Sequence, residues 1–119
     1  MRHIEWSPDG VDSLNEILEY YIDNVDEKTA NNIYQKIIEK INKLQNDKIR
    51  TKQCQELKDI GIFGIYEIVI NPWKIYYKIT EDNKIAYILF VLDARRNIEE
   101  ILISKVIDGK MTEGSSNPD

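Results

Sequence analysis

Apolar residues in the first third of the chain recur every three or four positions. One run extends from Val11 to Val25 and a second from Ala30 to Leu44, on either side of a polar break near residue 24. This spacing places the apolar side chains on one face of a helix. The Ser-Pro-Asp sequence at residues 7–9 supplies an N-cap, a proline suited to the first helical position and a carboxylate that favours the helix dipole. The pattern predicts two helices that form an antiparallel hairpin.

After Gly61 the pattern becomes that of β-strands. Residues 62–70 are rich in β-branched and aromatic side chains, and residues 73–80 alternate strictly between two faces. Residues 85–92 are almost continuously apolar, which predicts a central strand covered on both faces. Because short turns separate these three strands, they should form an antiparallel meander.

Two shorter elements complete the expected order. Residues 3–6 (HIEW) are an extended candidate, and helical spacing returns from Ile98 to Asp108-Gly109, whereas residues 48–61 look irregular. The order β-α-α-β-β-β-α predicts an α+β domain, in which an N-terminal helical hairpin packs on one face of a mostly antiparallel four-stranded sheet that a short helix closes. We expect a single domain over residues 1–110 and a polar, flexible tail over residues 111–119.

Composition narrows the possible functions. The chain of 119 residues is 42% hydrophobic and 31% charged, as is typical of a soluble globular protein. It has no apolar run long enough to span a membrane and no secretory signal, and its one cysteine, Cys54, suits the cytoplasm. His3 and Cys54 are the only soft metal ligands, so we expect neither a zinc site nor a cofactor. His3 lies in a predicted strand, and the chain has no catalytic triad pattern and no glycine-rich phosphate loop.

Charge is distributed unevenly along the chain. The net charge is −5, but residues 36–96 hold twelve basic and eight acidic side chains, a net of +4. Lys74 and Lys78 flank Tyr76 on one face of the 73–80 strand. If the hairpin covers the other face, these three side chains are exposed and suited to bind phosphates, a base or an acidic peptide. The alternative is a solvated sheet face whose lysines discourage aggregation.

Arg95 and Arg96 follow the apolar strand directly. Either guanidinium offers a planar fork to a carboxylate or phosphate at a position where loops often carry function. The alternative is a pair of helix-surface ion pairs, because Glu99 and Glu100 lie four residues further on. Adjacent residues cannot share one face, so at most one arginine should point into a site. The basic residues of the 48–52 loop either add to this rim or only keep the loop soluble; they are Lys48, Arg50 and Lys52.

Three strings in this order resemble toxins of the RelE/ParE superfamily, which belong to type II toxin–antitoxin (plasmid stabilisation) modules. IEWSPDGVDSLNEILEYY is similar to the family's opening strand and helical hairpin. NPWKIYYKI is similar to its proline-aromatic-basic strand, and LDARRNIEEIL to its basic pair and closing helix. The resemblance covers nearly all of residues 2–107 and implies the RelE-like fold.

The resemblance implies different activities for the two branches of the superfamily. RelE-like members are ribosome-dependent endoribonucleases that cut messenger RNA with basic residues of the sheet, here Lys74, Lys78, Arg95 or Arg96, and a late tyrosine. Residues 101–107 read ILISKVI, without that tyrosine, and Tyr66 stands where an arginine is frequent. ParE-like members, which the RRNIEEIL run resembles more closely, inhibit DNA gyrase by binding it.

The expected function is therefore that of a ParE-like, growth-inhibiting toxin that a cognate antitoxin neutralises in a hetero-oligomer. A ribosome-dependent ribonuclease and a non-toxic binding module of the same fold are the alternatives. Whichever holds, the expected target- or antitoxin-binding residues are Lys74, Tyr76, Lys78, Arg95 and Arg96.

Overall fold

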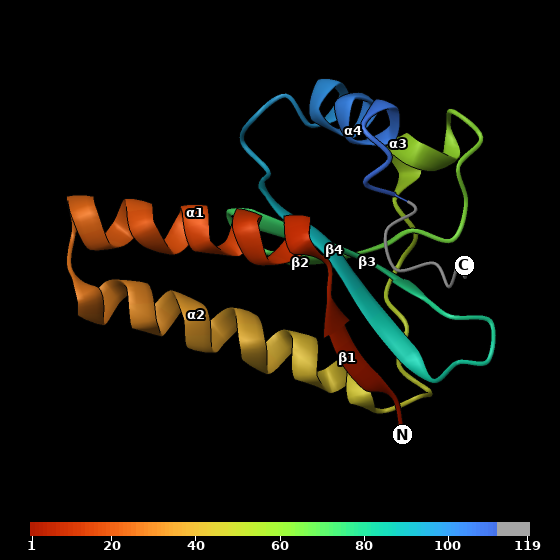
Figure 1. The fold of residues 1–119 in the computed structure, drawn as a ribbon, viewed down its shortest axis with the longest axis horizontal. Coiled ribbons are helices and arrows are strands. Elements are labelled where there is room, and N and C mark those ends of the chain that lie inside the picture. Colours follow the sequence, from red (N-terminus) through yellow and green to blue (C-terminus); the bar gives the residue numbers. More distant parts are fainter. Residues whose placement is uncertain (112–119) are drawn as a thin grey trace.

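Residues 1–111 form four strands and five helical segments. Their order is the predicted one, except that two short helical segments are added between the second long helix and the strand that follows it. The computed structural model describes residues 1–111. Its elements are β1 (His3–Trp6), α1 (Pro8–Asn24), α2 (Glu27–Asn42), the 3₁₀ turn η1 (Lys43–Gln45), α3 (Gln55–Lys58), β2 (Tyr66–Ile70), β3 (Trp73–Ile79), β4 (Ile85–Asp93) and α4 (Ile98–Ile107). Figure 1 shows α1 and α2 side by side on one side of the sheet and α3 and α4 on the other.

The four strands form one mixed sheet in the order β1-β4-β3-β2. β1 is parallel to β4, and the β2–β3 and β3–β4 pairs are antiparallel, as the short turns predict. The β3–β4 register shifts between Tyr76, which pairs with Phe90, and Tyr77, which pairs with Ile88. This bulge leaves Leu89 without a partner in β3, and both Leu89 and Phe90 pack in the same core.

The helical hairpin forms the first core with one face of the sheet. Ser7 caps α1 by accepting a hydrogen bond from the Gly10 amide at 2.8 Å, and Pro8 occupies the first turn, as predicted. Asp26 caps α2 through the Thr29 amide at 2.7 Å. The buried side chains come from both helices, η1 and three strands: Leu14, Ile33, Ile37, Ile41, Leu44, Ile68, Trp73, Ile75, Tyr77, Ala86, Ile88 and Val91.

A second core covers the opposite face of the sheet. It holds Cys54, Leu57, Ile65, Tyr76, Leu89, Phe90, Leu92, Leu102 and Met111. The prediction that β4 is covered on both faces is confirmed, because the hairpin covers one face and α3 and α4 cover the other. A four-residue helix such as α3 is too short to show helical periodicity in the sequence. The sequence therefore did not predict that α3 covers part of this sheet face.

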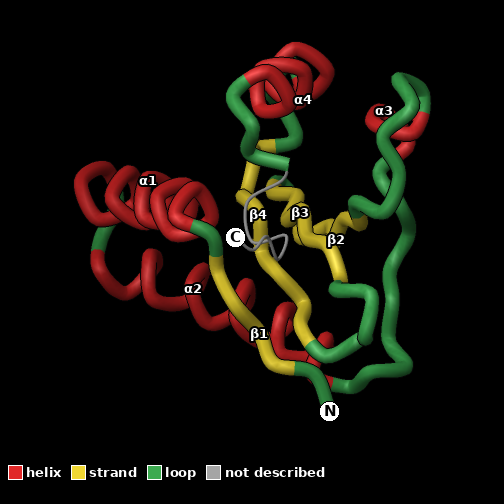
Figure 2. The backbone as a smooth tube through the Cα atoms, turned by 45° about the vertical axis from the view of Figure 1, so that its right-hand side comes forward, coloured by secondary structure: helices red, strands yellow, loops and turns green. Residues whose placement is uncertain are grey.

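Arg2 stabilises the fold from a buried position that the sequence did not predict. Its side chain is only 2% exposed. It donates to the carbonyl oxygens of Leu44, Asn46, Asp47 and Ile49 and to Asn83 Oδ1, at 2.7–3.3 Å. Arg2 therefore ties the start of β1 to the end of the hairpin and to the β3–β4 turn (Figure 2).

The predicted boundary between domain and tail needs one correction. Met111 is buried in the second core, so the folded domain includes the first residue of the predicted tail. The rest of that tail, residues 112–119, lies outside the described residues. Within residues 1–111, no helix has both the length and the apolar character to cross a membrane.

Candidate functional site

The turn between β4 and α4 positions the two arginines. The Ala94 amide donates to the Pro72 carbonyl at 2.7 Å, and the Arg96 amide donates to the Asp93 carbonyl at 3.1 Å. Asn97 then caps α4, because its Oδ1 accepts from the Glu100 amide at 3.3 Å. The helix consequently begins only at Ile98, after both arginines, and they do not occupy helical positions from which to reach residues 99 and 100.

Arg95 is held by the carboxylate of Asp93. Its Nε and Nη2 donate to Asp93 Oδ1 and Oδ2 at 2.9 and 2.6 Å, which is a bidentate geometry. The Arg95 hydrogen bond holds the pKa of Asp93 below its usual value, and the same contact raises the pKa of Arg95. Arg95 is thus exposed but already paired.

Arg96 is exposed and differs from its neighbour. Among the contacts of residues 1–111, its guanidinium has neither a hydrogen bond nor an ion pair. It lines two adjacent hollows, one on each side of its position. Arg96 is therefore the cation of the pair that is available to an incoming anionic group.

The first hollow, here called the aromatic cleft, has a volume of about 540 Å³. It lies between α1 and the ends of β3 and β4. Tyr21 contacts Trp73 edge to face at 6.0 Å between ring centroids and Tyr20 at 5.3 Å. Tyr20 and Val25 are 59% and 56% exposed. The lining residues are Glu16, Ile17, Tyr20, Tyr21, Val25, Trp73, Asp93, Arg95 and Arg96.

The second hollow, here called the α1–α4 groove, has a volume of about 340 Å³. It follows β4 beyond the end of β1, where the edge of β4 meets side chains of α1. Ser7 Oγ donates to the Leu89 carbonyl at 2.6 Å, and the Val91 amide donates to Ser13 Oγ at 2.9 Å. Lys105 lies in the groove with its ammonium 2.6 Å from Asp9 and above the ring of Phe90. Asp9 therefore neutralises the charge of Lys105. The groove can accommodate a partner by its shape, and Arg96 supplies the positive charge beside it.

The predicted basic-aromatic face of β3 is covered, which corrects the expectation of an open surface. Tyr76 is 0% exposed in the second core. Lys74 lies 3.6 Å from the Glu67 carboxylate, and Lys78 donates to the Met111 carbonyl at 3.3 Å. Burial lowers the pKa of Lys78. The physical reason is the second core: α3, α4 and Met111 cover the face that the alternation pattern left open.

The remaining sequence candidates lie apart from the arginine pair. Arg50 packs on the Tyr66 ring at 5.4 Å, and Lys52 lies 3.4 Å from Glu67. Tyr66 pairs with Tyr77, whereas Asp93 pairs with Trp73, so the two groups lie towards opposite ends of β3. Lys48 and His3 are exposed. The aromatic cleft, the α1–α4 groove and Arg96 between them are here called the Arg96 surface. The basic 48–52 loop does not extend this surface.

Sequence reasoning missed the aromatic wall of the cleft. The helical spacing of the Val11–Val25 run places Tyr21, or alternatively Ile22, on the apolar face, and it does not single out Tyr20. A signal was available, because two adjacent aromatic residues in a helix point about 100° apart and cannot both face the core.

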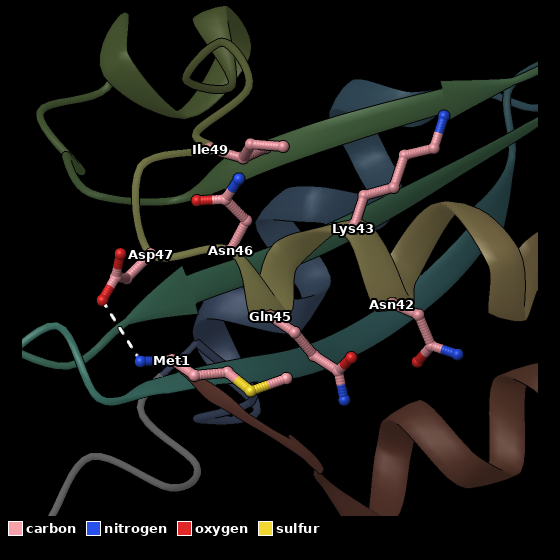
Figure 3. Close-up of a pocket in the computed structure, with 7 residues that line it drawn as sticks. All are labelled: Met1, Asn42, Lys43, Gln45, Asn46, Asp47 and Ile49. Atoms are coloured by element: carbon pink, nitrogen blue, oxygen red, sulfur yellow. Dashed lines mark hydrogen bonds and ion pairs between the residues drawn. The ribbon is translucent and has the colours of Figure 1, made fainter.

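A further hollow, of about 550 Å³, lies beside η1 and the start of the chain. Its lining includes three amide side chains, and its one carboxylate, Asp47, already pairs with the Met1 amino group at 3.3 Å. Figure 3 shows the Lys43 ammonium pointing away from this pair. Because these polar groups do not converge, the hollow has less of the character of a binding site than the Arg96 surface.

Comparisons with known proteins agree with this architecture. A solved chain described as "Chromosomal ParDE TA system from P. aeruginosa" superposes with a TM-score of 0.64 at 16% identity, covering 78% of this chain and 96% of that one. At this identity the match shows a shared fold and nothing further. The family model "ParE toxin of type II toxin-antitoxin system, parDE" matches residues 4–98. The chain therefore belongs to the ParE toxin family. A search of curated proteins finds no significant match.

Proposed function

We propose that this toxin arrests growth in the cytoplasm by binding a macromolecular target such as DNA gyrase, and that a cognate antitoxin neutralises it. The observation that carries the proposal is the unpaired Arg96 guanidinium beside the exposed aromatic wall of the cleft. Arginine, tyrosine and tryptophan are the residues that most often dominate binding energy at protein interfaces. The surface is suited to binding, and the residues that line its two hollows include no cysteine and no histidine.

The chemistry of this surface indicates what a partner segment presents. Arg96 offers two parallel N–H donors to a carboxylate or phosphate. The cleft beside it accepts an apolar or aromatic side chain against Tyr20 and Tyr21. The antitoxin is expected to contribute an acidic, partly apolar segment that folds on this surface and excludes the target.

Binding is a better account of this site than ribonuclease activity. The ribonuclease alternative requires Lys74 and Lys78 to act on an open sheet face together with the arginine pair. Both lysines are partly buried and already contact protein groups, Lys74 the Glu67 carboxylate and Lys78 the Met111 carbonyl, whereas the two arginines are exposed.

The experiment is induction of the toxin alone, followed by separate measurement of growth, gyrase supercoiling and messenger RNA integrity. We expect growth arrest and inhibited supercoiling with intact messages, reversed by co-expression of the antitoxin. Arg96→Ala should weaken inhibition by about thirtyfold, the equivalent of a 2 kcal/mol interface residue. Arg50→Ala removes an exposed arginine elsewhere and should leave inhibition unchanged.

Three outcomes would overturn the proposal. Cleaved messages with normal supercoiling would establish the ribonuclease alternative. Antitoxin binding without growth arrest would establish a non-toxic binding module. Equal activity of the wild type and Arg96→Ala would show that another surface carries the function.

A further inference from the structure

A buried polar cluster lies in the second core, away from the Arg96 surface. One sulfur and two carboxylates, from Cys54, Glu56 and Glu67, have ligand atoms within 4.8 Å of one another. Cys54 Sγ is 3.5 Å from Glu56 Oε1. Cys54 is fully buried, Glu67 is 2% exposed and Glu56 is half-buried. The cluster is therefore shielded from solvent at Cys54 and Glu67 and is accessible to solvent only beside Glu56.

The fold positions these groups from three neighbouring segments. Cys54 precedes α3 and its amide donates to the Ile65 carbonyl at 2.7 Å, which fixes this segment beside β2 (Figure 2). Glu56 lies in the first turn of α3. Glu67 lies in β2, directly opposite Tyr76 of β3, so both side chains project from the same sheet face.

Two buried polar atoms of this cluster have no hydrogen-bond partner: Glu67 Oε1 and the Tyr76 hydroxyl. The Tyr76 hydroxyl interacts electrostatically with Cys54, Glu67 and Glu56. Buried polar groups are almost always paired, so two orphan oxygens facing one cluster call for a ligand. Lys52 and Lys74 approach only Glu67 Oε2, at 3.4 and 3.6 Å, and leave Oε1 available.

We propose that Cys54, Glu56 and Glu67 bind one Zn²⁺ ion, with the Tyr76 hydroxyl or a water molecule in the fourth position. Thiolate and carboxylate are both accepted zinc ligands. A tetrahedral site with zinc–ligand bonds of about 2.0–2.3 Å separates its ligand atoms by roughly 3.5 Å. Ligand atoms within 4.8 Å of one another therefore need to close by about 1.3 Å at most.

The charges of the cluster are compatible with this ion. When Zn²⁺ binds, the Cys54 proton is released to solvent and the site carries one thiolate and two carboxylates. The divalent ion and the Lys74 ammonium offset these three negative charges, and the Lys52 ammonium, which also pairs with Glu67, is largely exposed to solvent. Sequence reasoning excluded zinc by counting only histidine and cysteine. It had no means of foreseeing that the fold gathers two glutamates around the single cysteine.

The ion would link α3 to the sheet, so binding should be visible without any toxin assay. The test uses the full-length protein, stripped with a chelator and titrated with Zn²⁺ by calorimetry and with Co²⁺ by absorption spectroscopy. We expect one ion per chain, a sulfur-to-cobalt charge-transfer band and a higher unfolding temperature with Zn²⁺.

Variants of the ligands separate this site from adventitious surface binding. Glu56→Gln changes a half-buried side chain and should weaken Zn²⁺ binding by at least about tenfold with the fold intact by circular dichroism. Cys54→Ser should lose the charge-transfer band. Glu99→Gln, an exposed glutamate of α4, is the matched control and should bind as the wild type does.

The proposal is overturned if Co²⁺ gives no charge-transfer band. It is equally overturned if Glu56→Gln and Glu99→Gln bind Zn²⁺ alike. These outcomes are independent of gyrase inhibition, because the cluster and the Arg96 surface lie on different elements.

Discussion

Arg2 provides the sharpest test of how this fold is held together. We consider Arg2→Met, which retains the length and apolar stem of the side chain and removes the guanidinium. The wild-type group donates to four main-chain carbonyls and to Asn83 Oδ1. These acceptors belong to η1, the loop after it and the β3–β4 turn, so one side chain joins three segments that are distant in the sequence.

The magnitude follows from the acceptors that are left behind. A hydrogen bond from a charged donor contributes about 1.5–3 kcal/mol, and an acceptor left unsatisfied in the interior costs about 1–3 kcal/mol. The contributions are not additive, and only the Leu44 contact is fully buried; the other carbonyls can regain water. We therefore expect Arg2→Met to lower the free energy of unfolding by about 3 kcal/mol. For a chain of this size the melting temperature should fall by about 12 °C.

The assay is urea and thermal denaturation followed by circular dichroism. Arg50→Met is the matched control, because Arg50 is an exposed arginine in the same neighbourhood whose loss changes the net charge equally. Its destabilisation should stay below about 1 kcal/mol. Equal effects of the two substitutions would refute the reasoning, since charge rather than the buried contacts would then set the stability.

Three further predictions concern other sites. Gly10→Ala should destabilise the fold by about 1 kcal/mol in urea titrations, because its methyl group would meet the Ile88 carbonyl oxygen at 2.7 Å and outweigh the gain in helix propensity; a stabilised variant would contradict this. Arg95 lowers the pKa of Asp93, so their pairing stabilises the fold above the unfolded-state pKa near 3.8 and is lost as the pH falls through the lower folded-state pKa. Acid unfolding should therefore be less steep below about pH 4 in Asp93→Asn, and identical profiles would exclude the effect. Tyr76→Phe should raise the stability of metal-free protein by about 1 kcal/mol in thermal denaturation, because it removes a buried hydroxyl that lacks a partner; a loss of stability would show that the hydroxyl is satisfied.

Local sequence patterns predicted those elements whose signals are themselves local. Helical spacing and the Ser7-Pro8 start located the first helix, and alternation located β3. The apolar run of β4 correctly indicated cover on both faces. The family resemblance supplied the connection of these elements into a RelE/ParE-type fold, which periodicity alone does not determine.

Features that depend on distant contacts were not predictable in the same way. An arginine at position 2 is normally solvated, and its burial depends on carbonyls more than 40 residues away. The face of β3 was assigned from alternation alone, but its exposure depends on α3, α4 and Met111. Glu67 stands among apolar residues of a strand, and its surroundings become visible only when β2, β3 and the segment before α3 are brought together.

The division of the arginine pair follows from the residues on either side of it. Asp93, at the end of β4, accepts hydrogen bonds from Nε and Nη2 of Arg95, while Asn97 caps α4 and donates from Nδ2 to Glu100 Oε2 at 2.6 Å. Glu99 and Glu100 therefore lie in the first turn, where carboxylates favour the helix dipole. With Arg95 neutralised, the charge available at this junction is that of Arg96 alone. A partner's anionic group should consequently depend on one guanidinium, so Arg96→Ala should affect binding far more than Arg95→Ala.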